Sequence, residues 1–104
     1  MRDRDPGEYL VKGNILANLF RGMEGVGGKI DITNERVIFK AHSLNFQREP
    51  LEIRISEIQH VGKRSTWGII PNGMEIATRK GETYKFVLYN RGNVIKTINE
   101  LRNA

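Results

Sequence analysis

The stretch from Gly28 to Ala41 alternates between apolar and polar side chains, and this pattern predicts two strands joined by a tight turn. Successive side chains of a strand point to opposite faces, so a period of two is typical of a half-buried strand. The turn is expected at residues 33–35, because Asn34 tolerates backbone conformations that most residues avoid. The side chains expected in the core are Ile30, Ile32, Val37 and Phe39. Those expected on the opposite face of the second strand are Arg36, Ile38 and Lys40.

The same alternation recurs along the chain and predicts further short strands. They are expected within residues 51–56, 58–63, 74–79 and 84–89. Lys80 and Gly81 form the expected hairpin turn between the last two. Residues 8–20 fit a first strand best, although their apolar spacing also suits a helix, because Gly13 and Asn14 are poor helix formers. The glycine-rich residues 22–28 are expected to form a loop after that strand.

The C-terminal residues change to the period of a helix. One face of this helix is expected to carry Val94, Ile95, Ile98 and Leu101. The opposite face is expected to carry Lys96, Thr97, Glu100 and Arg102. Residues 90–93 contain two asparagines, which are suited to cap the first turn. The apolar face is wide enough to bury against the strands, so the helix is expected to be part of the core.

About seven strands followed by one helix predict a mainly β protein. Because no helix is expected between strands, a parallel sheet is disfavoured. Hairpin-connected strands favour an antiparallel barrel or sandwich, with the C-terminal amphipathic helix capping one open side. Residues 1–7 alternate in charge and end in Pro6-Gly7, and we expect a flexible tail that ends in a turn there. Residues 8–104 are expected to form a single domain.

Composition narrows the possible classes of protein. The chain has 104 residues and no cysteine, so disulfide bonds and thiolate metal sites are excluded. It shows no long apolar run and no signal-peptide pattern, and we expect a cytoplasmic protein, with peripheral contact at the inner membrane face as a further expectation. The formal net charge is +5. That excess serves solubility, or it attracts the chain to an anionic surface such as a lipid bilayer.

Four segments give the chain a resemblance to the GRAM domain family, which has the pleckstrin-homology-like fold. They are residues 28–39, 53–58, 71–76 and 84–86, and the resemblance runs from about residue 8 to the end. The chain looks most like the short, stand-alone bacterial members. The resemblance implies two nearly orthogonal sheets of four and three strands with a C-terminal helix. It also implies a binding module for lipids or protein partners.

In lipid-binding relatives, the ligand meets a rim made by the first, third and sixth loops between strands. The resemblance therefore implies a candidate anionic-ligand rim in this chain. The residues that these loops carry here are Arg21, His42, Arg48, Arg79 and Lys80. The alternative is that the rim is only a solvated, charged surface.

Residues 64–73 contain the single tryptophan together with glycine, proline and asparagine, and this mixture predicts an irregular loop. An exposed aromatic and aliphatic loop beside a basic pair can insert at a membrane interface or dock on a protein. The candidate interaction loop consists of Lys63, Arg64, Trp67, Ile69 and Ile70. Alternatively, Trp67 and Ile69 fold back as a lid over the core.

No pattern in the chain predicts catalysis. His42 and His60 have no acidic or sulfur neighbours at metal-ligand spacing, so no metal site and no cofactor are expected. The aromatic residues do not interleave with Lys and Arg on one strand face, which disfavours nucleic-acid binding. We therefore expect a non-enzymatic binding module that engages a protein partner or an anionic membrane surface. The alternative is a self-associating scaffold protein that uses the Trp67 loop as its interface.

Overall fold

The computed structural model describes residues 5–42, 49–66 and 70–104, and these residues form seven strands, a short 3₁₀ turn and one α-helix. The first four strands are β1 (Leu10–Arg21), β2 (Glu24–Thr33), β3 (Arg36–Ala41) and β4 (Leu51–Arg54). The 3₁₀ turn η2 (Ile55–Glu57) leads into β5 (Ile58–Thr66), β6 (Ile70–Thr78) and β7 (Thr83–Leu88). The helix α1 (Arg91–Arg102) follows. The mainly β fold with a C-terminal helix is therefore confirmed.

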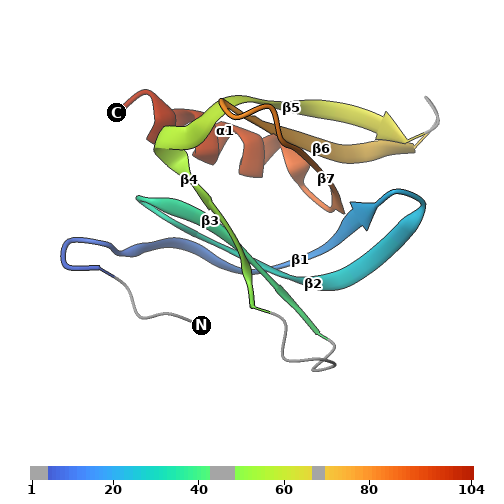
Figure 1. Cartoon of the computed structure of the whole chain (residues 1–104), viewed down its shortest axis with the longest axis horizontal. Coiled ribbons are helices and arrows are strands. Elements are labelled where there is room, and N and C mark those ends of the chain that lie inside the picture. The colour runs from blue at the N-terminus through green and yellow to red at the C-terminus, as the bar shows by residue number, and fades with distance from the viewer. Residues whose placement is uncertain (1–4, 43–48, 67–69) are drawn as a thin grey trace.

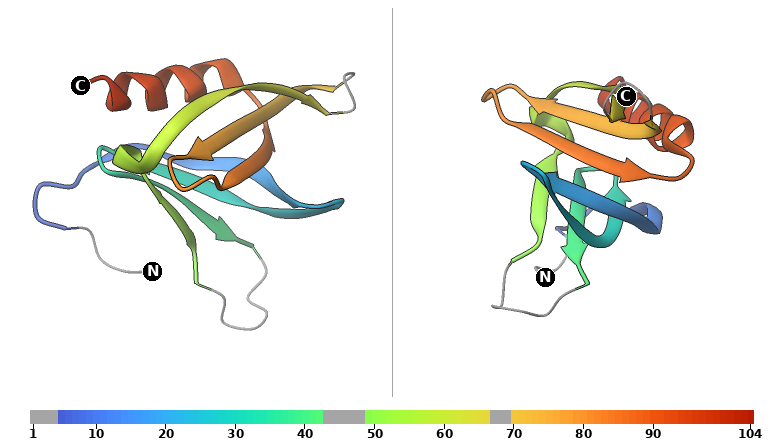
Figure 2. Two further views of the ribbon diagram at one scale, coloured as in Figure 1. Left: turned by 45° about the horizontal axis from the view of Figure 1, so that its top comes forward. Right: turned by 90° about the vertical axis from the view of Figure 1, so that its right-hand side faces the viewer.

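All neighbouring strands pair antiparallel in the order β4-β3-β2-β1-β7-β6-β5. The sheet bends into two layers that cross each other, with β1–β4 in one layer and β5–β7 in the other (Figure 1). The helix lies along the β5–β7 layer at the side where the two layers open (Figure 2). Strand β1 joins the layers, because it pairs with β2 along its length and with β7 from Ala17 to Phe20.

The predicted hairpin of β2 and β3 supplies much of the core. Ile30, Ile32, Val37 and Phe39 are all buried, as the alternation predicted, and the rings of Phe39 and Phe86 lie 5.8 Å apart. The expectation for the other face of β3 was wrong at two positions. Arg36 and Ile38 are also buried, each with only 1% of its surface exposed. At these two positions the outer face of β3 is therefore buried rather than exposed to solvent.

The expected glycine-rich loop at residues 22–28 is replaced by a strand. Strand β2 already begins at Glu24, and its glycines pair with the end of β1. The hydrogen bonds of this long hairpin compensate for the weak strand propensity of glycine. At Gly28 the chain needs a glycine, because a Cβ would lie 2.6 Å from the Phe39 ring and too close to the carbonyl oxygen of Lys40.

The expected irregular loop at residues 64–73 is also wrong over most of its length. Strand β5 continues to Thr66 and β6 begins at Ile70, with Arg64 opposite Gly73 in the register. Pro71, Asn72 and Gly73, which suggested a loop, are part of β6. The strand is irregular there, because the register of the β5–β6 pair shifts between Arg64 and Thr66.

Helix α1 packs on the sheet much as its periodicity predicts. Val94 and Ile98 are buried, while Ile95 and Leu101 pack partly buried against the core. Two details differ. Thr97 is buried rather than solvent-facing, and its hydroxyl donates to the Asn93 carbonyl. Asn90 adopts a left-handed conformation and makes no side-chain cap. The described helix lacks the length and apolar character that crossing a membrane requires.

Candidate functional site

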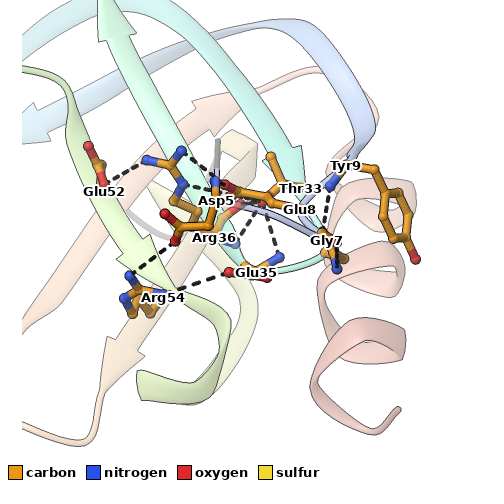
Figure 3. A network of polar contacts seen from close by, with 10 residues as sticks. Asp5, Gly7, Glu8, Tyr9, Thr33, Glu35, Arg36, Glu52 and Arg54 are labelled. Atoms are coloured by element: carbon orange, nitrogen blue, oxygen red, sulfur yellow. Dashed lines mark hydrogen bonds and ion pairs between the residues drawn. The ribbon is translucent and has the colours of Figure 1, made fainter. Parts of the chain in front are cut away.

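A buried ionic network lies on the outer face of β2, β3 and β4 (Figure 3). At its centre, Arg36 donates from Nε to Glu8 Oε2 at 2.7 Å and from Nη2 to Glu8 Oε1 at 3.1 Å. Arg36 also donates from Nη1 to Glu52 Oε1 at 2.8 Å. The Thr33 hydroxyl donates to Glu8 Oε2 at 2.6 Å. The side chains of Arg36 and Glu8 are 1% and 0% exposed, so the pair is closed to water.

The electrostatics of this network favour the charged forms. The hydrogen bonds from Arg36 outweigh the desolvation of the Glu8 carboxyl and lower its pKa to about 2. The same contact with Glu8 raises the pKa of the Arg36 guanidinium. Such a bidentate pair is a strong charge-assisted interaction, and it holds the segment before β1 on the sheet. With no free side to offer a ligand, the pair is a structural element.

Further hydrogen bonds attach the same N-terminal segment to the β2–β3 turn. The Asn34 side chain accepts from the Tyr9 amide at 2.8 Å and donates to the Gly7 carbonyl at 3.2 Å. Asp5 and Glu8 close a turn through the bond from Glu8 N to Asp5 O. Residues 5–7 thus form a turn on the domain, where the sequence predicted the turn at the end of the tail.

Asp5, Glu8 and Glu35 bring their carboxylates within 4.8 Å of one another. Cationic side chains already face this group. Glu8 is bound to Arg36, while Asp5 and Glu35 lie 3.8 and 3.9 Å from the guanidinium of Arg54. The cluster is therefore neutralised by arginine.

A pocket of about 510 Å³ opens at the corner where the β2–β3 turn, η2, the β6–β7 turn and the end of α1 meet. We call it the arginine pocket, because its lining includes Arg54, Arg79 and Arg102. Its apolar lining residues are Leu101, which is partly exposed, and Ile55 and Ile58, which are buried. Asn34, Glu35, Ser56, Asn103 and Ala104 complete the lining. No pattern in the sequence indicated this pocket, because its arginines come from three elements far apart in the chain.

Two of the three arginines are held in place by the backbone. Arg79 donates from Nε to the Ser56 carbonyl at 3.1 Å. Arg102 donates from Nη2 to the Gln59 carbonyl at 2.6 Å and from Nη1 to Asn99 Oδ1 at 2.8 Å. Each guanidinium carries five N–H donors, so both retain further donors. The arrangement can bind an anion.

The structure places most of the predicted rim in exposed positions at strand ends. Arg21 ends β1, and His42 follows β3, its amide donating to the Gly27 carbonyl. Arg79 and Lys80 form the β6–β7 turn, where Lys80 Nζ lies 3.7 Å from Glu57. Among the described side chains, no hydrogen bond or ion pair joins Arg21 or His42 to this turn. Arg48 lies outside the described residues.

Little of the predicted interaction loop can be placed. Lys63 is exposed on β5. Arg64 belongs to β5 and Ile70 begins β6, so their backbones are part of a hairpin. Trp67 and Ile69 lie outside the described residues, and the role of this loop stays a prediction.

Comparison with known proteins identifies the family. Residues 3–104, nearly the whole chain, match the GRAM domain. The chain belongs to the GRAM domain family. No curated protein matches it.

Several solved structures share the fold of this GRAM domain. One is the C-terminal domain of an unknown protein from Leishmania infantum, with a TM-score of 0.79 and 17% identity over 95% of this chain and 88% of that one. Another is the Vps36 N-terminal PH domain, with a TM-score of 0.76 and 12% identity over 96% and 83% of the two chains. A third contains the DH/PH domains of p115-RhoGEF (R399E mutant), with a TM-score of 0.70 and 11% identity over 93% and 31%. At these identities the likeness shows a pleckstrin-homology-like fold.

Proposed function

We propose that this GRAM domain is a non-enzymatic binding module that docks on an anionic membrane surface through its basic rim. GRAM and pleckstrin-homology-like domains are binding modules for lipids or proteins. The observation that carries the proposal is the exposure of Arg21, His42, Arg79 and Lys80 at strand ends, in a chain with a net charge of +5. Such a module works from the cytoplasm, at the inner face of the membrane.

The rim sets the expected strength of this contact. Each cation near an anionic surface contributes about 1 kcal/mol, and the three rim residues Arg21, Arg79 and Lys80 together give about 3 kcal/mol. That corresponds to roughly millimolar affinity. Binding is therefore expected to be weak, and to decrease as salt screens the charges.

Co-sedimentation with vesicles tests the proposal. At low salt, the protein should sediment with phosphatidylcholine vesicles that contain phosphatidylglycerol, and stay in solution with phosphatidylcholine alone. Arg21→Gln should reduce the sedimented fraction. Lys96→Gln removes the same charge from an exposed position on α1 and should leave that fraction close to that of the unmodified protein. Equal sedimentation with both kinds of vesicle would remove the membrane proposal.

A second candidate function is binding to a protein, including another copy of this chain. It is favoured by two exposed apolar side chains, Leu16 at 61% and Tyr89 at 88%. Because Ala17 pairs with Leu88, Leu16 and Tyr89 lie at adjoining positions on the outward side of β1 and β7. A self-association interface there, or at the predicted Trp67 loop, would bury apolar surface.

Sedimentation velocity at rising protein concentration tests this second candidate. If the Leu16 and Tyr89 surface is the interface, Tyr89→Ser should abolish the oligomer. Tyr9→Ser is a matched control, because Tyr9 is also an exposed tyrosine at 59%. A monomer throughout the concentration series would rule out self-association.

A further inference from the structure

The arginine pocket lies apart from most of the basic rim. Of the rim residues that the structure describes, only Arg79 reaches it, whereas Arg54 and Arg102 come from β4 and the last turn of α1. We propose that this pocket binds the phosphate group of a small phosphorylated ligand, held by the guanidinium groups of Arg54, Arg79 and Arg102. The ligand is either a free phosphorylated molecule or the headgroup of a lipid.

The donors of the pocket are available and partly oriented. In the described part of the chain, the two Nη groups of Arg79 have no hydrogen-bond or ion-pair partner, while its Nε is fixed on Ser56. Arg102 is fixed by two hydrogen bonds. A guanidinium that is already oriented loses less conformational entropy when it binds a ligand. Two of the three arginines are therefore prepared for a multiply charged oxygen acceptor such as the tetrahedral phosphate group.

Arg54 is the adjustable member of the three. Its guanidinium is 48% exposed, and its carboxylate partners Asp5 and Glu35 are 3.8 and 3.9 Å away. At these distances the pairs are ion pairs without short hydrogen bonds. Exposed pairs of this kind contribute little, and a guanidinium carries five N–H donors, so Arg54 can bind a phosphate while it still neutralises both carboxylates.

The charge balance of the pocket favours an anion. Among its lining residues, Glu35 is the one acidic side chain, against three arginines. The carbonyl end of α1 also faces this corner and carries partial negative charge. Arg102 lies in the last turn of the helix and opposes that charge. With Asp5, which lies 3.8 Å from the Arg54 guanidinium, three arginines face two carboxylates, and the excess is positive.

The shape of the pocket indicates what else the ligand carries. A volume of about 510 Å³ falls in the range of small-molecule sites and exceeds the needs of a bare phosphate ion. Ile55 and Ile58 are buried beneath the pocket, and Leu101, which is partly exposed, is the apolar lining side chain that can contact a carbon skeleton attached to the phosphate. A phosphate monoester of a small alcohol therefore fits better than inorganic phosphate.

Titration of the 104-residue chain with glycerol 3-phosphate, followed by amide NMR, tests the proposal. Saturable shifts are expected at Ser56, Arg79 and Arg102. Arg54→Gln and Arg102→Gln should each weaken binding by about tenfold, as expected for loss of a hydrogen bond to a charged group. Arg21→Gln, which changes the rim only, should leave the affinity unchanged. Unchanged amide spectra away from the substitution will show that the variants are folded.

The same variants separate this inference from the proposed membrane function and identify the source of the phosphate. If Arg54→Gln also weakens sedimentation with phosphatidic acid vesicles, the ligand is a lipid headgroup. If it weakens only glycerol 3-phosphate binding, the ligand is a free molecule. Failure of vesicle binding with intact glycerol 3-phosphate binding would remove the membrane function alone. Absence of saturable shifts would overturn the pocket proposal, and so would an affinity of Arg54→Gln and Arg102→Gln equal to that of the unmodified protein. Arg54-dependent binding of a glutamate-rich peptide in place of glycerol 3-phosphate would overturn it too.

Discussion

Arg36 and Arg54 lie directly opposite each other on β3 and β4, yet their surroundings differ in almost every respect. Arg36 is 1% exposed and bound to Glu8 and Glu52 at hydrogen-bond distance. Arg54 is 48% exposed, and its acidic neighbours lie 3.8 and 3.9 Å away. An arginine thus belongs to a buried ionic network at position 36 and lines an open pocket at position 54.

The difference comes from Glu8, which reaches Arg36 from outside the sheet. Its segment covers the outer face of β3 and excludes water from the pair, which strengthens the interaction between the charges. Arg54, at the end of β4 beside η2, remains at the edge of that cover. We infer that a buried, fully bonded arginine in this fold serves stability, and that a half-exposed one with long ion pairs is free to serve binding.

The largest expected effect comes from Arg36→Leu. It leaves the buried carboxylate of Glu8 without its cation, and removal of one partner from a buried pair costs about 3–5 kcal/mol. Urea denaturation followed by circular dichroism measures this loss. Arg54→Leu is the matched control and should change the free energy of unfolding by about 0.5 kcal/mol or less. Similar losses for both substitutions would contradict the distinction between the two arginines.

Glu8→Gln should destabilise the protein by about 2 kcal/mol at neutral pH, since it loses a hydrogen bond between charged groups. The effect should depend on pH. The pKa of Glu8 is lowered from an ordinary 4.5 to about 2 in the folded state. Its contribution is therefore complete above pH 4.5 and is lost as the pH falls from there towards 2. Acid titration of the unfolding midpoint should show a flatter profile for the variant. Glu100→Gln, an exposed control on α1, should keep the steep profile.

Thr33→Val should cost about 1 kcal/mol, the usual net contribution of one hydrogen bond. Its hydroxyl donates to Glu8 and accepts from the Arg36 amide at 2.9 Å. Because the hydrogen bond to Glu8 contributes to lowering that carboxyl's pKa, the acid transition should move to higher pH in the variant. Chemical denaturation at two pH values measures both changes. An unchanged acid transition would show that Thr33 does not stabilise the charged form of Glu8.

Salt should have the smallest effect on the buried pair. Buried charges are screened much less than exposed ones. The difference in unfolding free energy between the unmodified protein and Arg36→Leu should therefore change by less than about 0.5 kcal/mol from low to high salt. Glycerol 3-phosphate binding at the arginine pocket should weaken over the same range. If the contribution of Arg36 to the free energy of unfolding decreases with salt, the Arg36–Glu8 pair behaves as an exposed surface ion pair.

The alternation of side chains was enough to predict the strands and much of the core. Ile30, Ile32, Val37 and Phe39 are buried where the period of two places them. That period reports only which face a side chain takes. It cannot report that a second segment, the one that carries Glu8, covers the other face, and so Arg36 was expected on a solvent-exposed face.

The candidate site was harder to predict because its parts are brought together only by the fold. Arg54, Arg79 and Arg102 stand in β4, the β6–β7 turn and the end of α1, with no common spacing. Glu8 and Arg36 are likewise separated by the whole β1–β2 hairpin. Loop predictions failed for a related reason. Strand pairing with β1 and β5 supplied hydrogen bonds that overruled the weak local propensity of glycine and proline.

The two pairings of strand β1 affect how the protein folds during its synthesis on the ribosome. Its pairing with β2 is available early, but its pairing with β7 joins Ala17 to Leu88, near the other end of the chain. Contacts so distant in sequence slow folding, because the intervening chain must close first. During synthesis the edge of β1 that pairs with β7 therefore stays unpaired and accessible to other chains until almost the whole domain has emerged from the exit tunnel.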